Sequence, residues 1–276
     1  MTFKIVADSS SDILFLNQVP FSSVPLKIIT NEKEYIDDYA LSVTEMIDDL
    51  KKYKGPSKSS CPNTDEWLNA FEDYDCIFCV TITSNLSGSY NSARLALNEY
   101  LQANPNRKGF VIDTLSVGPE SVLIIEELCR LIVDGLTFEE IKEKIIQYKN
   151  RTHLIFCLES MRNLANNGRV SPAVAKIAGL LGIRIVGKAS LNGTLEIIDK
   201  ARGSEKAHTS IIKNMQKTGF CGGKVHVHHC ENPTAAQRLA KSLTDLFPNT
   251  KITIRQTKAL CSFYAESGGM LIGYEG

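Results

Sequence analysis

The sequence lacks the features that mark secretion, membrane insertion and binding driven by bulk charge. Residues 1–8 contain neither the charged region nor the apolar core of a signal peptide. No apolar run is long enough to cross a bilayer, since the most apolar stretch, residues 177–186, is interrupted by Arg184. The 31 basic residues balance the 31 acidic residues, so net charge favours neither nucleic acid nor an anionic membrane. The sequence therefore predicts a cytoplasmic protein that binds no nucleic acid and does not insert stably into a membrane.

Motifs for nucleotide binding and for nucleophilic catalysis are also missing. The sequence contains no Walker loop, no G-x-G-x-x-G fingerprint and no G-x-S-x-G nucleophile elbow. None of the 5 histidines stands beside a serine-rich loop in the sequence, although residues distant in sequence can meet in the fold. These absences favour a binding protein that needs no cofactor over a hydrolase or a transferase, which stays the weaker alternative.

Cysteine and histidine are present, but their pattern does not predict a metal site. Most of the 8 cysteines stand in apolar runs, which is typical of buried, reduced cysteine. Cys76 and Cys79 have the spacing of a metal-binding pair, yet in a strand they would point to opposite faces. His226 and His228 would share a face at a strand end, where a solvent-exposed strand end is a simpler interpretation than a metal site.

The first half of the chain alternates strand and helix patterns. Short apolar runs bounded by polar turns predict buried strands at 3–7, 75–83 and 109–113. Capping patterns predict helix starts at Ser42, Asn63 and Thr137. Repeated strand–helix units of this kind favour an α/β domain with a mostly parallel, doubly wound sheet.

The second half has a different pattern, which predicts a mixed sheet. The Asn192-Gly193 pair between two strand-like runs is a hairpin signal. The expected strands are 151–158, 183–189, 195–199, 224–229, 251–256 and 270–274, and the expected helices are 160–167, 171–181, 204–217 and 233–247. We therefore expect two α/β domains, residues 1–150 and 151–276.

Three polar loops of the first half are candidate ligand sites, because open α/β sheets bind ligands beyond the carboxyl ends of their strands. Residues 8–12 alone favour a serine-rich turn that caps the next helix. Residues 59–63 place hydroxyl groups beside a helix start. Residues 84–93 open a helix with hydroxyl groups and Gly88, a combination that suits an anion. This loop has no lysine, which favours a singly charged carboxylate over a polyphosphate.

One basic residue of the second half could complement these loops. Arg169 stands on an expected turn between two helices. Taken alone, it suits a solvated charge at the end of a helix. The functional alternative is a charged lid over the anion.

Taken together and in their order along the chain, these segments resemble the motifs of the DegV family of bacterial fatty-acid-binding proteins. The family pattern L-S-G-T-Y-x-S-A matches residues 86–93 closely, and L-x-x-G-G-R-[IV]-S matches residues 164–171. Its D-S-T-[SA]-D, T-S-Q-P-S and K-x-R-G-x-x-K-A patterns match residues 8–12, 59–63 and 200–207. Each match is weak alone, but the five occur in order over most of the chain.

The resemblance implies a long-chain fatty acid held in a tunnel between the two domains, with its carboxylate bound by the polar loops. Arg169 would help present the head group to a separate ATP-dependent fatty acid kinase, so the carrier would perform no chemistry itself. By position, the expected carboxylate site comprises Ser59, Ser60, Ser87, Gly88, Ser89 and Arg169.

The sequence departs from the family patterns at positions that matter for the head group. Ser59 and Cys61 replace threonine and glutamine, and the hydroxyl of Ser59 preserves a donor. Glu266 replaces a histidine that neighbours the head group in the family. A carboxylate there would repel the lipid carboxylate, unless one of the pair is protonated or Arg169 lies between them. Either Glu266 points away, or the protein prefers a different or uncharged head group. The alternative to the carrier is a binder or sensor of another small organic acid or of a modified lipid.

Overall fold

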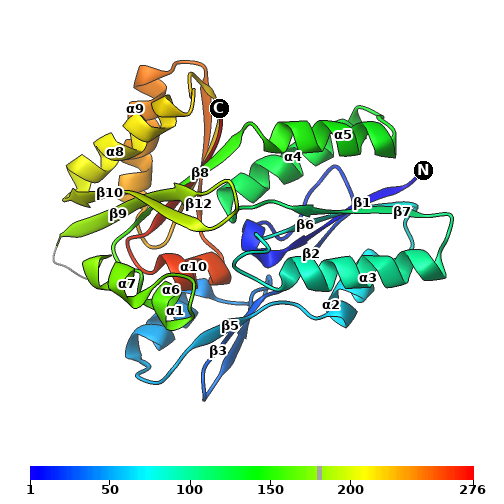
Figure 1. Cartoon of the computed structure of the whole chain (residues 1–276), viewed down its shortest axis with the longest axis horizontal. Helices are drawn as coiled ribbons and strands as arrows, with labels where there is room; N and C mark the ends of the chain where they lie inside the picture. The colour runs from blue at the N-terminus through cyan, green and yellow to red at the C-terminus, as the bar shows by residue number, and fades with distance from the viewer. Residues whose placement is uncertain (179–181) are drawn as a thin grey trace.

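The computed structural model describes residues 1–178 and 182–276, which form an α/β fold with three sheets among them (Figure 1). The strands of two sheets lie before residue 114, and those of the third lie after residue 151. The predicted α/β class is therefore confirmed, while the division at residue 150 stays a prediction. No helix of the described residues is both long enough and apolar enough to span a membrane.

The first sheet is parallel, with the strand order β2-β1-β6-β7. Its strands are β1 (Phe3–Asp8), β2 (Phe21–Val24), β6 (Cys76–Thr81) and β7 (Lys108–Asp113). One face packs on α2 (Thr64–Phe71) and α3 (Ser89–Ala103), the other on α4 (Pro119–Val133) and α5 (Phe138–Lys149). Side chains alternate along β6, so Cys79 faces α2 and α3 while Cys76 faces α4 and α5. The predicted doubly wound sheet is confirmed.

The predicted helix starts are also confirmed. The side chains of Asn63 and Thr137 each accept a hydrogen bond from the backbone N–H of a glutamate three residues on. The side chain of that glutamate in turn accepts a hydrogen bond from the backbone N–H of the capping residue. Ser42 caps α1 (Val43–Lys52) through the backbone N–H of Glu45. These caps satisfy N–H groups that the helices themselves leave without acceptors.

The serine-rich segment after β1 does not cap a helix, contrary to our expectation. Ser9–Ser11 form a single 3-10 turn, and the chain then continues to β2. The sequence did not predict β2 either. Three further strands were not predicted, because three residues are too few to show periodicity. They form an antiparallel sheet in the order β4-β3-β5, with β3 (Lys27–Ile29), β4 (Glu34–Ile36) and β5 (Lys58–Ser60).

The second half contains the expected mixed sheet, in the order β10-β9-β8-β13-β11-β12. Only the β11–β12 pairing is parallel among those described. The strands are β8 (Thr152–Leu158), β9 (Ile183–Ala189), β10 (Leu195–Arg202), β11 (Gly223–His229), β12 (Thr250–Gln256) and β13 (Met270–Glu275). The hairpin predicted at Asn192-Gly193 joins β9 to β10.

Five helices belong to the described part of this half. They are α6 (Arg162–Asn166), α7 (Pro172–Ala178), α8 (Ser204–Lys217), α9 (Pro233–Leu246) and α10 (Ala259–Ala265). The last three residues of the helix expected at 171–181 lie outside the described residues. The sequence did not predict α10, which contains only seven residues and lacks a side-chain cap.

A hydrophobic cluster joins the two halves and positions the site described below. Ile28 and Met46 of the first half pack in this cluster with Phe156 and Phe263 of the second. At its edge, α10 contacts both α1 and β3. Buried apolar surface shared in this way resists separation of the halves.

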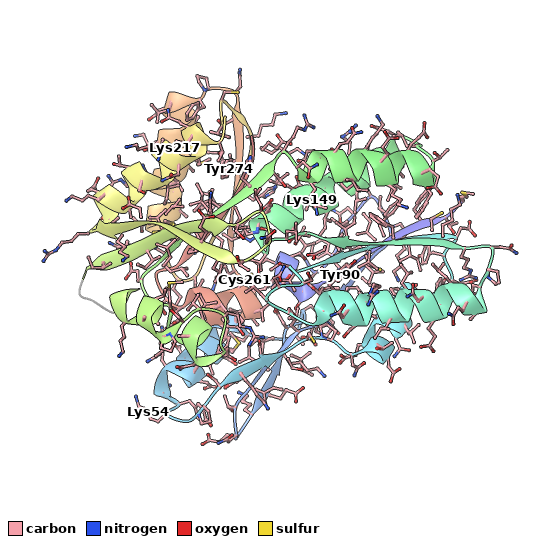
Figure 2. All side chains as sticks on the ribbon, in the orientation of Figure 1. Lys54, Tyr90, Lys149, Lys217, Cys261 and Tyr274 are labelled. Carbon is pink, nitrogen blue, oxygen red and sulfur yellow. The ribbon has the colours of Figure 1, made fainter. Side chains whose placement is uncertain are left out.

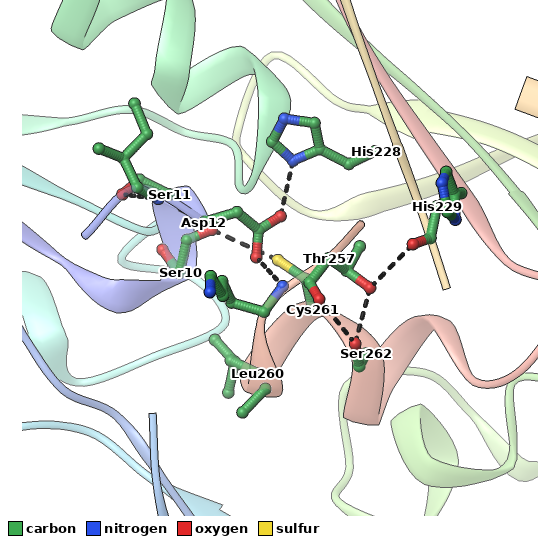
Figure 3. A network of polar contacts seen from close by, with 12 residues as sticks. Ser10, Ser11, Asp12, His228, His229, Thr257, Leu260, Cys261 and Ser262 are labelled. Carbon is green, nitrogen blue, oxygen red and sulfur yellow. Dashed lines mark hydrogen bonds and ion pairs between the residues drawn. The ribbon is translucent and has the colours of Figure 1, made fainter. Parts of the chain in front are cut away.

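The two histidines at the end of β11 contradict our expectation of a solvent-exposed strand end. His226 and His228 are buried against the first half. Nε2 of His226 lies 3.2 Å from Glu126 on α4, and Nδ1 of His228 lies 2.7 Å from Asp12 (Figure 3). Buried imidazoles need polar partners, and each carboxylate supplies one. The second ring nitrogens, Nδ1 of His226 and Nε2 of His228, are buried with no hydrogen-bond partner among the described residues. The histidines therefore link the halves, and the described residues contain no group of three metal-binding side chains.

Candidate functional site

A cavity of about 300 Å³ lies between the two halves, with a largely apolar wall. Leu154, Phe156 and Leu158 of β8 line it, because alternate side chains of a strand share one face. The intervening Ile155 and Cys157 pack in a separate core cluster behind the strand. The first half completes the apolar wall with residues that include Leu26, Ile82 and Val117.

Polar groups meet in one part of this cavity, and they come from both halves. Ser59 and Ser60 end β5, Ser87 and Gly88 precede α3, and Arg169 stands between α6 and α7. All five were expected from the sequence. The structure brings them together in one cavity lining, although they span 110 positions of the chain.

The segment before α3 presents hydrogen-bond donors to this cavity. Gly88 is the N-cap of α3, and no side chain caps the helix. The backbone N–H of Ser89 donates to Oγ of Ser87 at 3.3 Å. The start of the helix contributes a partial positive charge beside this hydroxyl group. Gly88 also lies close to Cys61, since a side-chain carbon at position 88 would come within 3.1 Å of the Cys61 sulfur. This close approach brings two of the polar loops together.

Ser89 does not line the cavity, which corrects its assignment to the carboxylate site. Its side chain is fully buried, and its hydroxyl donates to Oδ2 of Asp8 at 2.5 Å. The same carboxylate accepts bonds from the hydroxyl of Ser10 and from the backbone of Ile82. Burial nevertheless raises the pKa of Asp8 above its usual value. Ser89 therefore holds the loop on the sheet instead of facing a ligand.

Arg169 is not a solvated charge at a helix end. Its Nε donates to the carbonyl oxygen of Leu86 at 3.1 Å, and its Nη1 donates to the carbonyl oxygen of Asn167. Leu86 belongs to the loop of the first half that carries Ser87. The guanidinium thus fixes the donor loop from the opposite half.

Glu266 is directed away from the cavity, which corrects its place as a neighbour of the head group. It follows α10 with a φ of 54°, and its Oε1 accepts a hydrogen bond from the backbone N–H of Asn163 at 3.1 Å. Its Oε2 lies 3.7 Å from Arg162. The side chain lines a separate cavity between α1 and α6. Glu266 therefore points away from the expected head-group site, which was one of the two possibilities that the sequence left open.

Tyr264 was missed by the sequence analysis, although its hydroxyl belongs to the polar part of the cavity. Tyr264 stands on α10, and its hydroxyl lies 2.6 Å from Oγ of Ser59. Leu260, Cys261 and Ala265 of α10 line the same cavity. This spacing places all four residues on one face of a helix, a pattern that would have indicated a buried face had the helix been recognised.

Buried carboxylates of the first half hold α10 in place. Asp37 accepts hydrogen bonds from the backbone N–H groups of Ala259 and Leu260 at 2.9 and 3.0 Å. Asp12 accepts one from the backbone of Lys258 at 2.8 Å (Figure 3). Burial raises the pKa of Asp37 to about 7. The helix that carries Tyr264 is therefore anchored to the opposite half of the molecule.

The arrangement suits a ligand with one anionic end and an apolar body. The hydroxyl groups, the N–H groups and the guanidinium can all donate hydrogen bonds to a carboxylate. The residues that line the described cavity include no histidine, aspartate or glutamate.

Comparisons with known proteins agree with this geometry. A model of the DegV protein family matches residues 2–275. A DegV domain-containing protein of Streptococcus pyogenes serotype M1 is 44% identical to the chain over 279 residues, covering 100% of both.

Two solved structures are similar in sequence and fold. The Fatty Acid Kinase (Fak) B3 protein of Streptococcus pneumoniae, loaded with linoleic acid, shares 44% identity with a TM-score of 0.98, covering 100% of this chain and 99% of that one. A protein from Eubacterium eligens, loaded with heptadecanoic acid, shares 42% identity with a TM-score of 0.97, covering 99% of both.

Proposed function

Because the chain belongs to the DegV family, we propose that it is a carrier that binds a long-chain fatty acid between its two halves. The observation that carries this proposal is a cavity with an apolar wall along β8 and a cluster of donors from Ser59, Ser87, Tyr264 and Arg169. The carboxylate binds at the donors, and the acyl chain lies along the apolar wall.

The expected contributions to the binding free energy favour an acyl ligand over a small acid. Each buried CH₂ group contributes about 0.8 kcal/mol, so sixteen carbons supply roughly 10 kcal/mol before the costs of ordering. A hydrogen bond to a charged group contributes about 1.5–3 kcal/mol. The acyl chain therefore supplies most of the affinity, while the donors fix the orientation of the carboxylate.

The carrier itself performs no chemistry in this proposal. A separate ATP-dependent fatty acid kinase in the cytoplasm phosphorylates the carboxylate of the bound lipid. Support comes from a cavity lining without histidine, aspartate or glutamate, and from a similar structure that is named as a Fatty Acid Kinase (Fak) B3 protein. The carrier needs no cofactor besides its lipid. Arg169 presents the carboxylate, because it joins the donor loop to the opposite half.

A chain-length titration separates this proposal from a binder of small organic acids. Delipidated protein is titrated with saturated fatty acids of eight, ten, twelve and fourteen carbons. Affinity should rise about fourfold for each added CH₂ until the cavity is filled, which is the equilibrium equivalent of 0.8 kcal/mol. Equal affinity for all four acids, or tighter binding of acetate, would reject the acyl carrier.

A further inference from the structure

A further cavity between the two halves, called the second cavity below, is distinct from the one that Glu266 lines, and the carrier function does not use it. It encloses about 650 Å³ and adjoins the first cavity at Leu154, which lines both. The first half contributes Glu120 of α4 and Lys149 of α5, and the second contributes Lys188 of β9 and Lys217 of α8. Three residues of the cavity lining, Lys149, Lys217 and Tyr274, are labelled in Figure 2.

The charge around this cavity is positive. Lys149 donates to the carbonyl oxygen of Asp113 at 2.9 Å, and Lys217 contacts the side chain of Asn214 at 3.5 Å. Neither ammonium group pairs with a carboxylate in the described part of the chain. Lys188 does pair, at 3.3 Å, with Glu196, which is about half exposed. Three lysines therefore line the cavity, and among the described residues only Lys188 is paired with a carboxylate.

Glu120 supplies a hydrogen-bonding group in the wall. Its side chain is 5% exposed and lines the cavity, and Thr152 donates to its Oε1 at 2.8 Å. Burial raises the pKa of this carboxyl to about 7, so near neutral pH only part of the population carries the negative charge that would oppose an anion. A buried carboxyl of this kind can form a hydrogen bond with a hydroxyl group of a ligand.

From these contacts we propose that the second cavity binds a phosphate monoester of a small hydroxylated molecule. The lysines hold the phosphate, which carries nearly two negative charges at neutral pH, and Glu120 meets a hydroxyl group. A carboxylate ligand would leave more of the positive charge unmatched. Because both halves supply ligand contacts, binding stabilises their closed arrangement. This proposal does not rest on the fatty-acid function of the first cavity.

Calorimetric titration with ribose 5-phosphate tests the proposal, with inorganic phosphate and ribose as partial ligands. Titrations at constant ionic strength remove general salt effects. We expect saturable binding at one molecule per chain, weaker binding of inorganic phosphate and none of ribose. No saturable heat with either phosphate compound would overturn the proposal.

Variants then locate the site. Lys149→Gln with Lys217→Gln should weaken ribose 5-phosphate binding by roughly tenfold or more, as expected for two exposed ion pairs. Lys213→Gln is the matched control, because Lys213 is exposed on α8 and lies outside this cavity. Glu120→Gln should affect ribose 5-phosphate more than inorganic phosphate. If the Lys213 variant loses as much affinity as the double variant, the binding is not in this cavity.

Discussion

The hydroxyl groups of Ser59 and Tyr264 lie 2.6 Å apart, although the two residues stand 205 positions apart in the chain. Ser59 belongs to a short strand of the first half, and Tyr264 belongs to α10 of the second. The donor cluster is therefore complete only when the halves are together. Asp12 and Asp37 maintain this arrangement, because both accept hydrogen bonds from the start of α10.

Tyr264→Phe tests whether this hydroxyl binds the lipid carboxylate. The substitution keeps the aromatic ring and removes one donor. We expect the affinity for palmitate to fall about tenfold, since a hydrogen bond to a charged group contributes about 1.5 kcal/mol or more. A direct titration of delipidated protein measures this. Tyr90→Phe on α3 is the control, because Tyr90 does not line the cavity. Equal affinities in all three proteins would exclude Tyr264 from the site.

Ser87→Ala tests the donor loop of the first half. Its hydroxyl lines the cavity, whereas Ser92, farther along α3, does not. We expect Ser87→Ala to weaken palmitate binding by about 1.5–3 kcal/mol and Ser92→Ala to leave it unchanged. The same titration measures both variants. Unchanged affinity in Ser87→Ala would remove this residue from the carboxylate site.

Arg169→Ala should impair transfer to the kinase more than retention of the lipid. The guanidinium binds two backbone carbonyl groups and so fixes the presenting loop, while the acyl chain supplies most of the affinity. Two rates are compared, dissociation of bound palmitate and its phosphorylation by the kinase with ATP. Arg162→Ala is the control, since Arg162 is exposed and pairs with Glu266. Wild-type phosphorylation rates in Arg169→Ala would contradict the presenting role.

The buried carboxyl of Glu120 predicts that stability falls with rising pH. Its pKa is raised by burial from 4.5 to about 7, so the folded protein binds more protons than the unfolded chain between these values. The contribution is present below pH 4.5 and is lost as pH rises through about 7. Its size is roughly 3 kcal/mol.

Urea unfolding at pH 5 and pH 8 measures this effect. Glu120→Gln, whose amide oxygen can still accept the bond from Thr152, should lose less stability between the two pH values than the wild type does. The difference between the two proteins isolates Glu120 from other titrating groups, including Asp37. An identical pH dependence in both proteins would show that Glu120 keeps an ordinary pKa.

Local patterns predicted the parts of the fold that depend on neighbours in sequence. The capping pairs at Asn63 and Thr137, the strand expected at 151–158 and the hairpin at Asn192-Gly193 are all set within a few residues. The donor loop before α3 was predicted for the same reason. Its residues combine a strand end, a glycine and a helix start in one short segment.

The remaining features depend on contacts that sequence order does not reveal. Ser89 and Glu266 stand in recognisable motifs, but only the packing of the halves decides that the first faces Asp8 and the second faces Asn163. His228 has the sequence context of a strand end. It is buried because α4 and the 3-10 turn after β1 cover it. Tyr264 was missed because α10 is short and is held by carboxylates of the other half.

Native mass spectrometry of the purified protein, followed by denaturing extraction, tests directly whether the protein carries a fatty acid. A carrier should show a mass increase that matches one fatty acid per chain, and should release that acid on denaturation. The extracted lipid would also identify the chain length that the cavity accepts. A protein that is empty as purified, and that stays empty after incubation with palmitate and with linoleate, would contradict the account.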